Sequence, residues 1–237
     1  MLNSLSIIIP VYNEEAYIGQ IIEKVSTVNF KEIFDWVELI VIDDGSTDNS
    51  YQVIQDLSIA YPDLKYLKLN TNSGKGSAIR AGFEIAKGSF LIVQDSDLEL
   101  VPEEIVKLAI FLKNEKLDMV NGSRFLEKRR HKGNTNMRNF ANSLFSNIAS
   151  IINLKTITDL TCGYKLFTRK LYENIKLREN RFGIEAELLT KALKYNQKKV
   201  KEYPVSYYPR EIKGGKKIRF TDGFRIIWAC IKYKIVN

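Results

Sequence analysis

The sequence contains few of the residues that build disulfide frameworks or thiolate and imidazole metal sites. It has two cysteines, Cys162 and Cys230, and one histidine, His131, in 237 residues. The two cysteines have no metal-like spacing and imply no disulfide framework, which fits a reducing cytoplasm. His131 lies in a basic segment, and we expect it to be solvated rather than catalytic.

Long hydrophobic runs are also missing. No apolar stretch approaches the roughly 20 residues that cross a bilayer. The first residues, Met1–Ser6, contain no basic segment of the kind that opens a signal peptide. We therefore expect a globular cytoplasmic protein, with any membrane contact made from the surface.

Positive charge exceeds negative charge. Lysine and arginine number 36 against 28 acidic residues, giving a net charge of +8, and the basic residues gather in Glu127–Lys132 and Lys213–Arg219. This excess suits phosphorylated substrates, anionic lipid or nucleic acid. No nucleic-acid recognition motif is present, so a nucleic-acid-binding module is the weaker reading and no nucleic acid is expected. The first basic cluster is predicted to be a loop over a site or membrane surface, or simply a solvated loop.

Hydrophobic segments of strand and helix type alternate through the first half. Strands are predicted at Leu5–Pro10, Val37–Ile42, Leu64–Leu69 and from Phe90, and helices at Ala16–Val28, from Asp48 or Ser50 to Leu57, and up to Ala86. This order predicts an α/β fold with a mostly parallel sheet and helices on both faces. No Gly-x-Gly-x-x-Gly motif follows the first strand, which argues against a dinucleotide-binding unit.

The second half continues with helices and shorter strands. Helices are predicted at Glu103–Lys113, Met137–Ile152, Ile184–Tyr195 and Asp222–Ile235, and extended segments at Leu117–Asn121, Gly163–Phe167 and Lys199–Tyr208. Tyr207 and Tyr208 are expected to pack on the sheet. No repeat, linker or internal boundary is evident, so residues 1–237 are predicted to form a single domain.

Three acids follow the strand that begins at Phe90. Asp95, Asp97 and Glu99 occupy alternate positions directly after the apolar residues. Ligands of open α/β sheets bind beyond the carboxyl ends of the strands. Neighbouring carboxylates repel each other unless a cation lies between them, and Mg²⁺ or Mn²⁺ takes carboxylate and phosphate oxygens. The pattern predicts a metal site for a diphosphate, with a simple polar turn as the alternative.

Other strand ends also present polar side chains. Glu14, Asp43, Asp44, Lys75 and Arg124 each follow a predicted strand, and the strand-end rule places them in one crevice. The acids could accept hydrogen bonds from a base or a ribose, and Lys75 could hold a phosphate at a helix start. Turn formation and helix capping are the alternatives. The Lys75 segment lacks P-loop spacing.

Taken together and in order, these motifs resemble the family 2 glycosyltransferases. The motifs are Ser6–Glu15, Ile42–Asp48, Asn72–Gly76 and Gln94–Leu98. Further segments look like the polyprenyl-phosphate branch of that family, which includes dolichyl-phosphate mannosyl- and glucosyltransferases: Asn121–Arg124, Asp159–Phe167, Arg181–Leu188 and Arg210–Lys216. The resemblance implies the GT-A (Rossmann-like) fold, a nucleotide-sugar donor and a divalent metal ion, Mg²⁺ or Mn²⁺.

The resemblance also implies roles for individual residues. The residues expected on the nucleotide side are Pro10, Tyr12, Glu14, Asp43, Asp44, Lys75, Ser96 and Lys165. Those expected to hold the metal ion are Asp95 and Asp97, with Glu99 standing where a relative has glutamine. Those expected to contact the acceptor phosphate or the diphosphate are Arg124, Arg210 and Lys216. Residues 1–100 would form the nucleotide-binding half, 101–220 the acceptor-binding half and 221–237 a C-terminal amphipathic helix.

The implied reaction is an inverting transfer of mannose or glucose from GDP-mannose or UDP-glucose to a polyprenyl phosphate. A phosphate acceptor is already an anionic nucleophile, so it needs no dedicated base. The alternative is a hydroxyl acceptor in polysaccharide or glycolipid synthesis, which would need a general base. Glu185 and Asp159 are the candidates for that role.

The end of the chain bears on membrane contact. Many dolichyl-phosphate mannose synthases have transmembrane helices after the catalytic domain, whereas this sequence stops at Asn237. The basic residues of Lys216–Arg219 followed by Phe224, Trp228 and Ile231 would suit an interfacial amphipathic element at the cytoplasmic face of a membrane. The alternatives are a helix that packs on the sheet and a membrane-embedded partner subunit.

Overall fold

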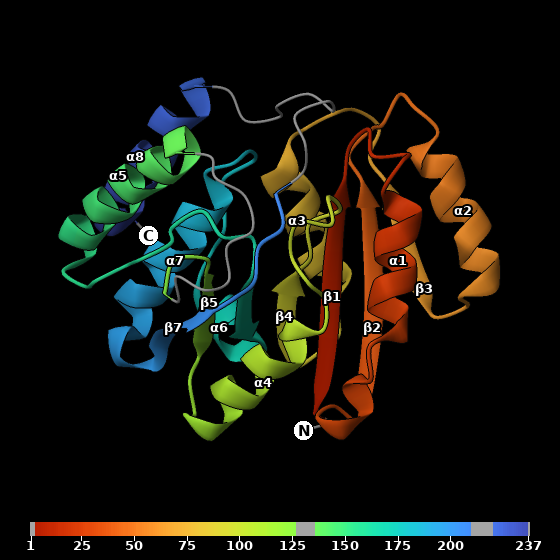
Figure 1. The fold of residues 1–237 in the computed structure, drawn as a ribbon, viewed down its shortest axis with the longest axis horizontal. Helices are drawn as coiled ribbons and strands as arrows, with labels where there is room; N and C mark the ends of the chain where they lie inside the picture. The colour runs from red at the N-terminus through yellow and green to blue at the C-terminus, as the bar shows by residue number, and fades with distance from the viewer. Residues whose placement is uncertain (1–2, 127–135, 210–219, 237) are drawn as a thin grey trace.

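A single seven-stranded sheet lies between two layers of helices (Figure 1). The computed structural model describes residues 3–126, 136–209 and 220–236. The elements of the first half are β1 (Ser4–Val11), α1 (Ile18–Thr27), η1 (Phe30–Glu32), β2 (Trp36–Asp43), α2 (Ser50–Ala60), β3 (Leu64–Lys68), α3 (Lys75–Ile85) and β4 (Phe90–Val93). Those of the second half are α4 (Glu104–Asn114), β5 (Met119–Ser123), α5 (Asn136–Asn153), β6 (Lys165–Thr168), α6 (Arg169–Asn174), α7 (Ile184–Asn196), η3 (Gln197–Lys199), β7 (Val200–Pro204) and α8 (Phe220–Ile235).

The sheet is mostly parallel. Its strand order is β3-β2-β1-β4-β6-β5-β7, and β6 alone runs antiparallel to its neighbours β4 and β5. The order reverses direction between β1 and β4, where doubly wound sheets open a crevice. The predicted α/β class with helices on both faces is confirmed.

Alternation along β1 divides its side chains between two cores. Leu5, Ile7 and Ile9 pack with α1, α2 and α4, whereas Ile8 packs with α3 and the helices of the second half. Successive strand residues point to opposite faces, so a strand that is apolar throughout is covered on both sides. Every β1 residue is buried, Ser4 and Ser6 included, and its run Ile7–Val11 is apolar as expected for a strand that is covered on both faces.

The start of α2 differs from the prediction. Asp48 or Ser50 was expected to cap this helix, but the cap position is Asn49, whose side chain makes no capping bond. Ser50 is instead the first helical residue, and its amide donates to Asp48 Oδ1 at 3.0 Å. The Ser50 hydroxyl is engaged elsewhere, accepting the amide of Glu14 at 2.8 Å, which ties the loop after β1 to this helix.

None of the helices in the described ranges is long and apolar enough to cross a membrane.

The short helix α6 was not predicted. It is one and a half turns long, too short for a periodic pattern, and it begins where Thr168 Oγ1 accepts the amide of Leu171 at 3.2 Å.

Gly82 lets α3 approach the sheet closely. A Cβ at this position would lie 2.5 Å from Ile8 Cγ2, so we expect Gly82→Ala to overpack the core and lower the free energy of unfolding by about 1–3 kcal/mol. Gly19→Ala in α1 is the matched control, since its Cβ would make ordinary contacts with Val53 and Leu57 at 3.5 and 3.8 Å. That variant should be neutral or up to about 1 kcal/mol more stable. Urea denaturation measures both, and equal stabilities would contradict the close approach.

Candidate active site

The loops after β1 and β2 pack against each other at the carboxyl edge of the sheet. Asp44 Oδ1 and Oδ2 accept the amides of Ser73 and Gly74 at 2.9 and 2.8 Å, which fixes the turn before α3. Burial raises the pKa of Asp44 above its ordinary value. Asp43 Oδ1 accepts the amide of Ser46 at 3.1 Å, whereas its buried Oδ2 has no hydrogen-bond partner among the described residues. That oxygen can therefore accept a bond from a ligand.

The residues predicted for a nucleoside pocket at the end of β1 are brought together. Pro10 lies in β1 beside the end of β2, Tyr12 is more than one third exposed, and Glu14 is buried. Between Tyr12 and Glu14, Asn13 adopts a φ of +52°, and its Oδ1 accepts the amide of Thr47 at 2.8 Å. The turn thus places one exposed aromatic ring and one buried acid at the end of β1, against the loop that follows Asp43.

Lys75 bridges two acids at the start of α3. Its Nζ lies 2.7 Å from Asp95 Oδ1 and 2.6 Å from Glu185 Oε1, and all three side chains are largely buried. Burial alone would lower the pKa of Lys75, but the two carboxylates outweigh it and hold that pKa above its ordinary value. Lys75 is therefore a permanent cation beside the first acid of the predicted metal motif.

The motif itself is held in a tight turn. Asp97 Oδ1 accepts the amide of Glu99 at 3.1 Å, and the intervening Leu98 has a φ of +59°. On the other side, Asp95 Oδ2 faces Gly163, where a Cβ would lie only 2.3 Å from that oxygen. A side chain there would displace the Asp95 carboxylate, so the loop before β6 passes directly over the first acid.

The donor set of this motif suits a hard divalent cation. Mg²⁺ sites commonly use one or two carboxylates and complete their coordination with substrate phosphates. Asp95 and Asp97 offer two carboxylates, and Ser96 between them is buried. No group of three acidic, histidine or cysteine side chains within residues 3–126, 136–209 and 220–236 forms a ready-made metal site. The residues thus fit a metal ion that arrives with a diphosphate.

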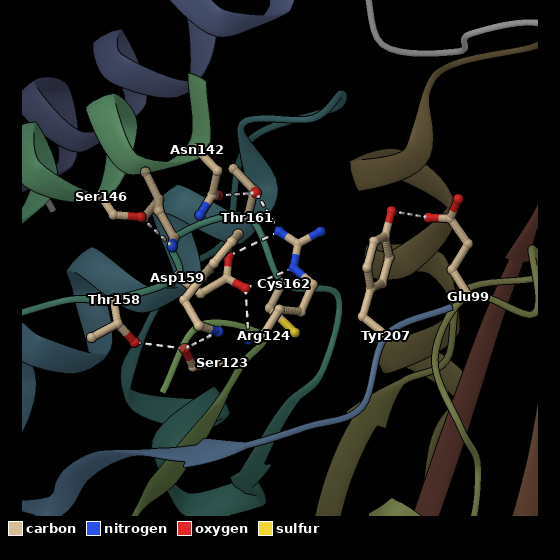
Figure 2. Close-up of polar contacts among 12 residues, drawn as sticks. Glu99, Ser123, Arg124, Asn142, Ser146, Thr158, Asp159, Thr161, Cys162 and Tyr207 are labelled. Atoms are coloured by element: carbon tan, nitrogen blue, oxygen red, sulfur yellow. Dashed lines mark hydrogen bonds and ion pairs between the residues drawn. The ribbon is translucent and has the colours of Figure 1, made fainter. Parts of the chain in front are cut away.

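Arg124, directly after β5, is held by a buried acid. Its Nε and Nη2 donate to the two Asp159 carboxylate oxygens at 2.7 and 2.9 Å, and Nη2 also donates to Thr161 Oγ1 at 2.9 Å (Figure 2). Thr161 in turn donates to Asn142 of α5 at 2.6 Å. Burial would lower the pKa of Arg124, but Asp159 raises it. The guanidinium is therefore fixed in place as a cation.

Glu202 of β7 supports this arrangement from beneath. Its carboxylate accepts the amide and hydroxyl of Thr158 at 2.9 and 2.7 Å, the amide of Asp159 at 3.3 Å and the side-chain amide of Asn121 at 3.0 Å. One acid thereby orients the loop that holds Arg124. Spacing along the sequence gave no sign of it, because its partners lie about 40 or more residues away.

Several predicted residues occupy other positions or lie outside the described ranges. Lys165 is buried, and its Nζ donates to the carbonyls of Leu160 and Cys162 at 3.1 and 2.6 Å; burial lowers its pKa. Residues 127–135 and 210–219, which include the basic clusters, His131, Arg210 and Lys216, are outside the structure described. Glu185 and Asp159, the candidate bases, are both engaged in ion pairs.

Tyr207 makes contacts that the sequence did not indicate. Its hydroxyl donates to Glu99 Oε2 at 2.8 Å, and its ring lies 5.0 Å from the guanidinium carbon of Arg124 (Figure 2). It was expected only to pack on the sheet. A tyrosine after an extended segment is common, so no sequence signal separates this role from simple packing.

Acids, a largely buried lysine and a largely buried arginine therefore lie together at the carboxyl edge of the sheet. The sequence profile described as "Glycosyl transferase family 2" matches residues 6–176. The chain belongs to this family, as its motifs predict.

The names of the similar proteins describe them as transferases of dolichyl or undecaprenyl phosphate. A dolichyl-phosphate beta-glucosyltransferase of Trichomonas vaginalis is 28% identical over 228 residues, covering 90% of this chain and 67% of that protein. The dolichol-phosphate mannosyltransferase of Pyrococcus furiosus is 30% identical over 209 residues, covering 86% and 56%. An undecaprenyl-phosphate 4-deoxy-4-formamido-L-arabinose transferase of Proteus mirabilis is 32% identical over 173 residues, covering 73% and 51%. The chain thus spans between half and two thirds of these relatives, and the predicted branch is confirmed.

A solved structure with the same fold is the glucosyl-3-phosphoglycerate synthase of Mycobacterium tuberculosis in complex with Mn²⁺, UDP and glucosyl-3-phosphoglycerate. It superposes with a TM-score of 0.73 at 18% identity, covering 98% of this chain and 80% of that one. At this identity the match establishes the GT-A fold alone.

The buried pair between Arg124 and Asp159 generates a stability prediction. Asp159→Asn removes the negative charge but keeps the shape, leaving a buried guanidinium without its counter-charge, so we expect a loss of about 3 kcal/mol in the free energy of unfolding. Asp118→Asn is the control, since its 3.9 Å pair with the half-exposed Lys199 should contribute less than about 1 kcal/mol. Denaturant titration compares them, and an equal, small effect in both variants would contradict the buried pair.

Proposed function

We propose that this enzyme transfers a hexose, with inversion, from a nucleoside-diphosphate sugar to a polyprenyl phosphate. The observation that supports it most is the line of contacts from the acid motif to a fixed arginine: Glu99 to Tyr207, and Tyr207 to Arg124. A site that joins two phosphorylated substrates needs fixed cations to offset their repulsion. The names of the relatives support the same substrate class.

The donor nucleotide would bind at the ends of β1 and β2. The unpartnered Asp43 Oδ2 is an acceptor for a base N–H or a ribose hydroxyl, and Tyr12 offers a ring face beside Pro10 and Glu14. Lys75 would offset diphosphate charge, with Asp44 fixing the turn before α3. Ser96 would support this half, and Lys165 of the second half would assist it by holding the carbonyls of the loop over Asp95. GDP-mannose and UDP-glucose are both candidate donors.

The metal ion, Mg²⁺ or Mn²⁺, would be held by Asp95 and Asp97, with Glu99 beside them. When bound, it would stabilise the negative charge that develops on the leaving nucleoside diphosphate. The Mn²⁺ and UDP in the structure from Mycobacterium tuberculosis support this choice of group. Within the chain, the turn at Leu98 keeps the carboxylates at one edge, and Lys75 offsets the charge of Asp95.

The acceptor phosphate would bind at Arg124, joined by Arg210 and Lys216. One of its anionic oxygens would attack the anomeric carbon as the bond from that carbon to the diphosphate breaks, through a transition state of oxocarbenium character. No proton needs to be removed from such an acceptor. The ion pairs of Glu185 and Asp159 support this, since neither carboxylate is free to act as a base. Residues 1–100 would thus bind the donor and residues 101–220 the acceptor.

The test is turnover by purified protein with Mn²⁺, UDP-glucose or GDP-mannose, and a short polyprenyl phosphate. We expect lipid-dependent release of one nucleoside diphosphate, reduced roughly 100-fold or more in Asp97→Ala because charge on the leaving group loses its stabilisation. Glu23→Ala, an exposed acid on α1, is the control and should keep full activity. Nucleotide binding without lipid-dependent turnover would indicate a hydroxyl acceptor instead, and no nucleotide binding would overturn the proposal.

We further propose that the enzyme works at the cytoplasmic face of a membrane, touching it through α8. Apolar side chains recur every three or four residues on the exposed face of this helix: Phe224, Trp228, Ile231 and Ile235. Basic side chains flank them: Arg225, Lys232 and Lys234. Helix α5 packs beside α8 and adds exposed Leu144 and Ile151 (Figure 1). An apolar stripe with basic edges suits an anionic lipid surface, and a membrane-embedded partner is the other candidate.

The two tryptophans of the chain provide a matched test of this surface. Trp228, 62% exposed on α8, and Trp36, 40% exposed at the start of β2, are each replaced by serine. Trp228→Ser should weaken binding to phosphatidylglycerol-containing vesicles roughly ten-fold, because the indole no longer leaves water. Trp36→Ser should bind as the wild type does. Co-sedimentation measures both, and unchanged binding by Trp228→Ser would contradict the assignment.

A further inference from the structure

The backbone around Tyr207 is anchored independently of its side chain. Residue 207 forms an isolated antiparallel bridge with Leu100, and the amide of Tyr208 donates to the Glu99 carbonyl at 2.9 Å. One residue earlier, the amide and hydroxyl of Ser206 donate to the Glu104 carboxylate at 2.7 and 3.0 Å. A change confined to the Tyr207 side chain should therefore leave the course of the chain unaltered.

The Tyr207 hydroxyl fixes one acid of the predicted metal motif. It donates to Glu99 Oε2 at 2.8 Å, a charge-assisted bond that selects one orientation of a flexible glutamate. Carboxylates that bind metal ions are usually held by such a second partner, and loss of that partner commonly weakens metal binding about 10- to 100-fold.

The Tyr207 ring fixes the arginine on the opposite side. The guanidinium carbon of Arg124 lies 5.0 Å from the ring centroid, within the range of a cation–π contact. Asp159 and Thr161 hold the edge of the same guanidinium. Figure 2 shows the ring between Arg124 and Glu99, so one side chain contacts both charged groups.

We propose that Tyr207 is a positioning residue that orients Glu99 for the metal–diphosphate side of the reaction and Arg124 for the acceptor side. Its hydroxyl orients Glu99, and its ring orients Arg124. This inference rests on the proposed function. It explains why one side chain contacts both halves of the site, although it is distant in sequence from each.

Two substitutions separate the two contacts. Tyr207→Phe removes the hydroxyl and keeps the ring; Tyr207→Leu removes both. Mn²⁺ affinity, measured by electron paramagnetic resonance in the presence of UDP or GDP, should fall roughly ten-fold in both variants. The KM for farnesyl phosphate should stay unchanged in Tyr207→Phe and rise about three-fold in Tyr207→Leu, as expected for loss of a cation–π contact.

Tyr208→Phe is the matched control and should behave as wild type in both measurements, since the contact of Tyr208 with Glu99 is a backbone hydrogen bond. Equal Mn²⁺ affinity in wild type and Tyr207→Phe would overturn the role of the hydroxyl, and an unchanged KM in Tyr207→Leu would overturn that of the ring. A wild type that binds Mn²⁺ but shows no lipid-dependent turnover would overturn the proposed acceptor and the ring's role with it. The metal titration would still decide the role of the hydroxyl.

Discussion

The ammonium group of Lys75 lies between the carboxylates of Asp95 and Glu185, and the arrangement of the site depends on this contact. Asp95, just after β4, and Glu185 of α7 meet at the carboxyl edge of the sheet, where like charges would repel each other in a partly buried setting. The lysine makes that meeting possible before any ligand arrives.

A second ion pair, between Arg124 and Asp159, also holds a cation in place with a buried acid. Arg124 is fixed by the fully buried Asp159, which Glu202 and its neighbours hold from below. The two charge clusters meet around the loop before β6, where Gly163 approaches Asp95 without room for a side chain. The site is therefore a set of paired charges in which acids hold the two cations, Lys75 and Arg124, in place.

Much of the fold and part of the site could be predicted from the sequence. Apolar runs such as β1 and the helical spacing of α1 depend on local patterns, and those predictions are confirmed. The cap of α2 was predicted wrongly, because several polar residues in a row offer similar capping groups and only the contact between Ser50 and the loop after β1 selects one register. The roles predicted for single residues such as Lys165 and Asp97 stay predictions.

By itself, the sequence determined the alternation of strands and helices, the position of acids and basic residues at strand ends, and membership in the family. These follow from short-range periodicity and from motifs whose residues are close together in the chain. Only the tertiary structure decided that Lys75 pairs with Glu185, that Asp159 is occupied by Arg124, and that Tyr207 touches both halves of the site. Such partners lie 35 to more than 100 residues apart, and their contact depends on how the sheet brings distant loops to one edge.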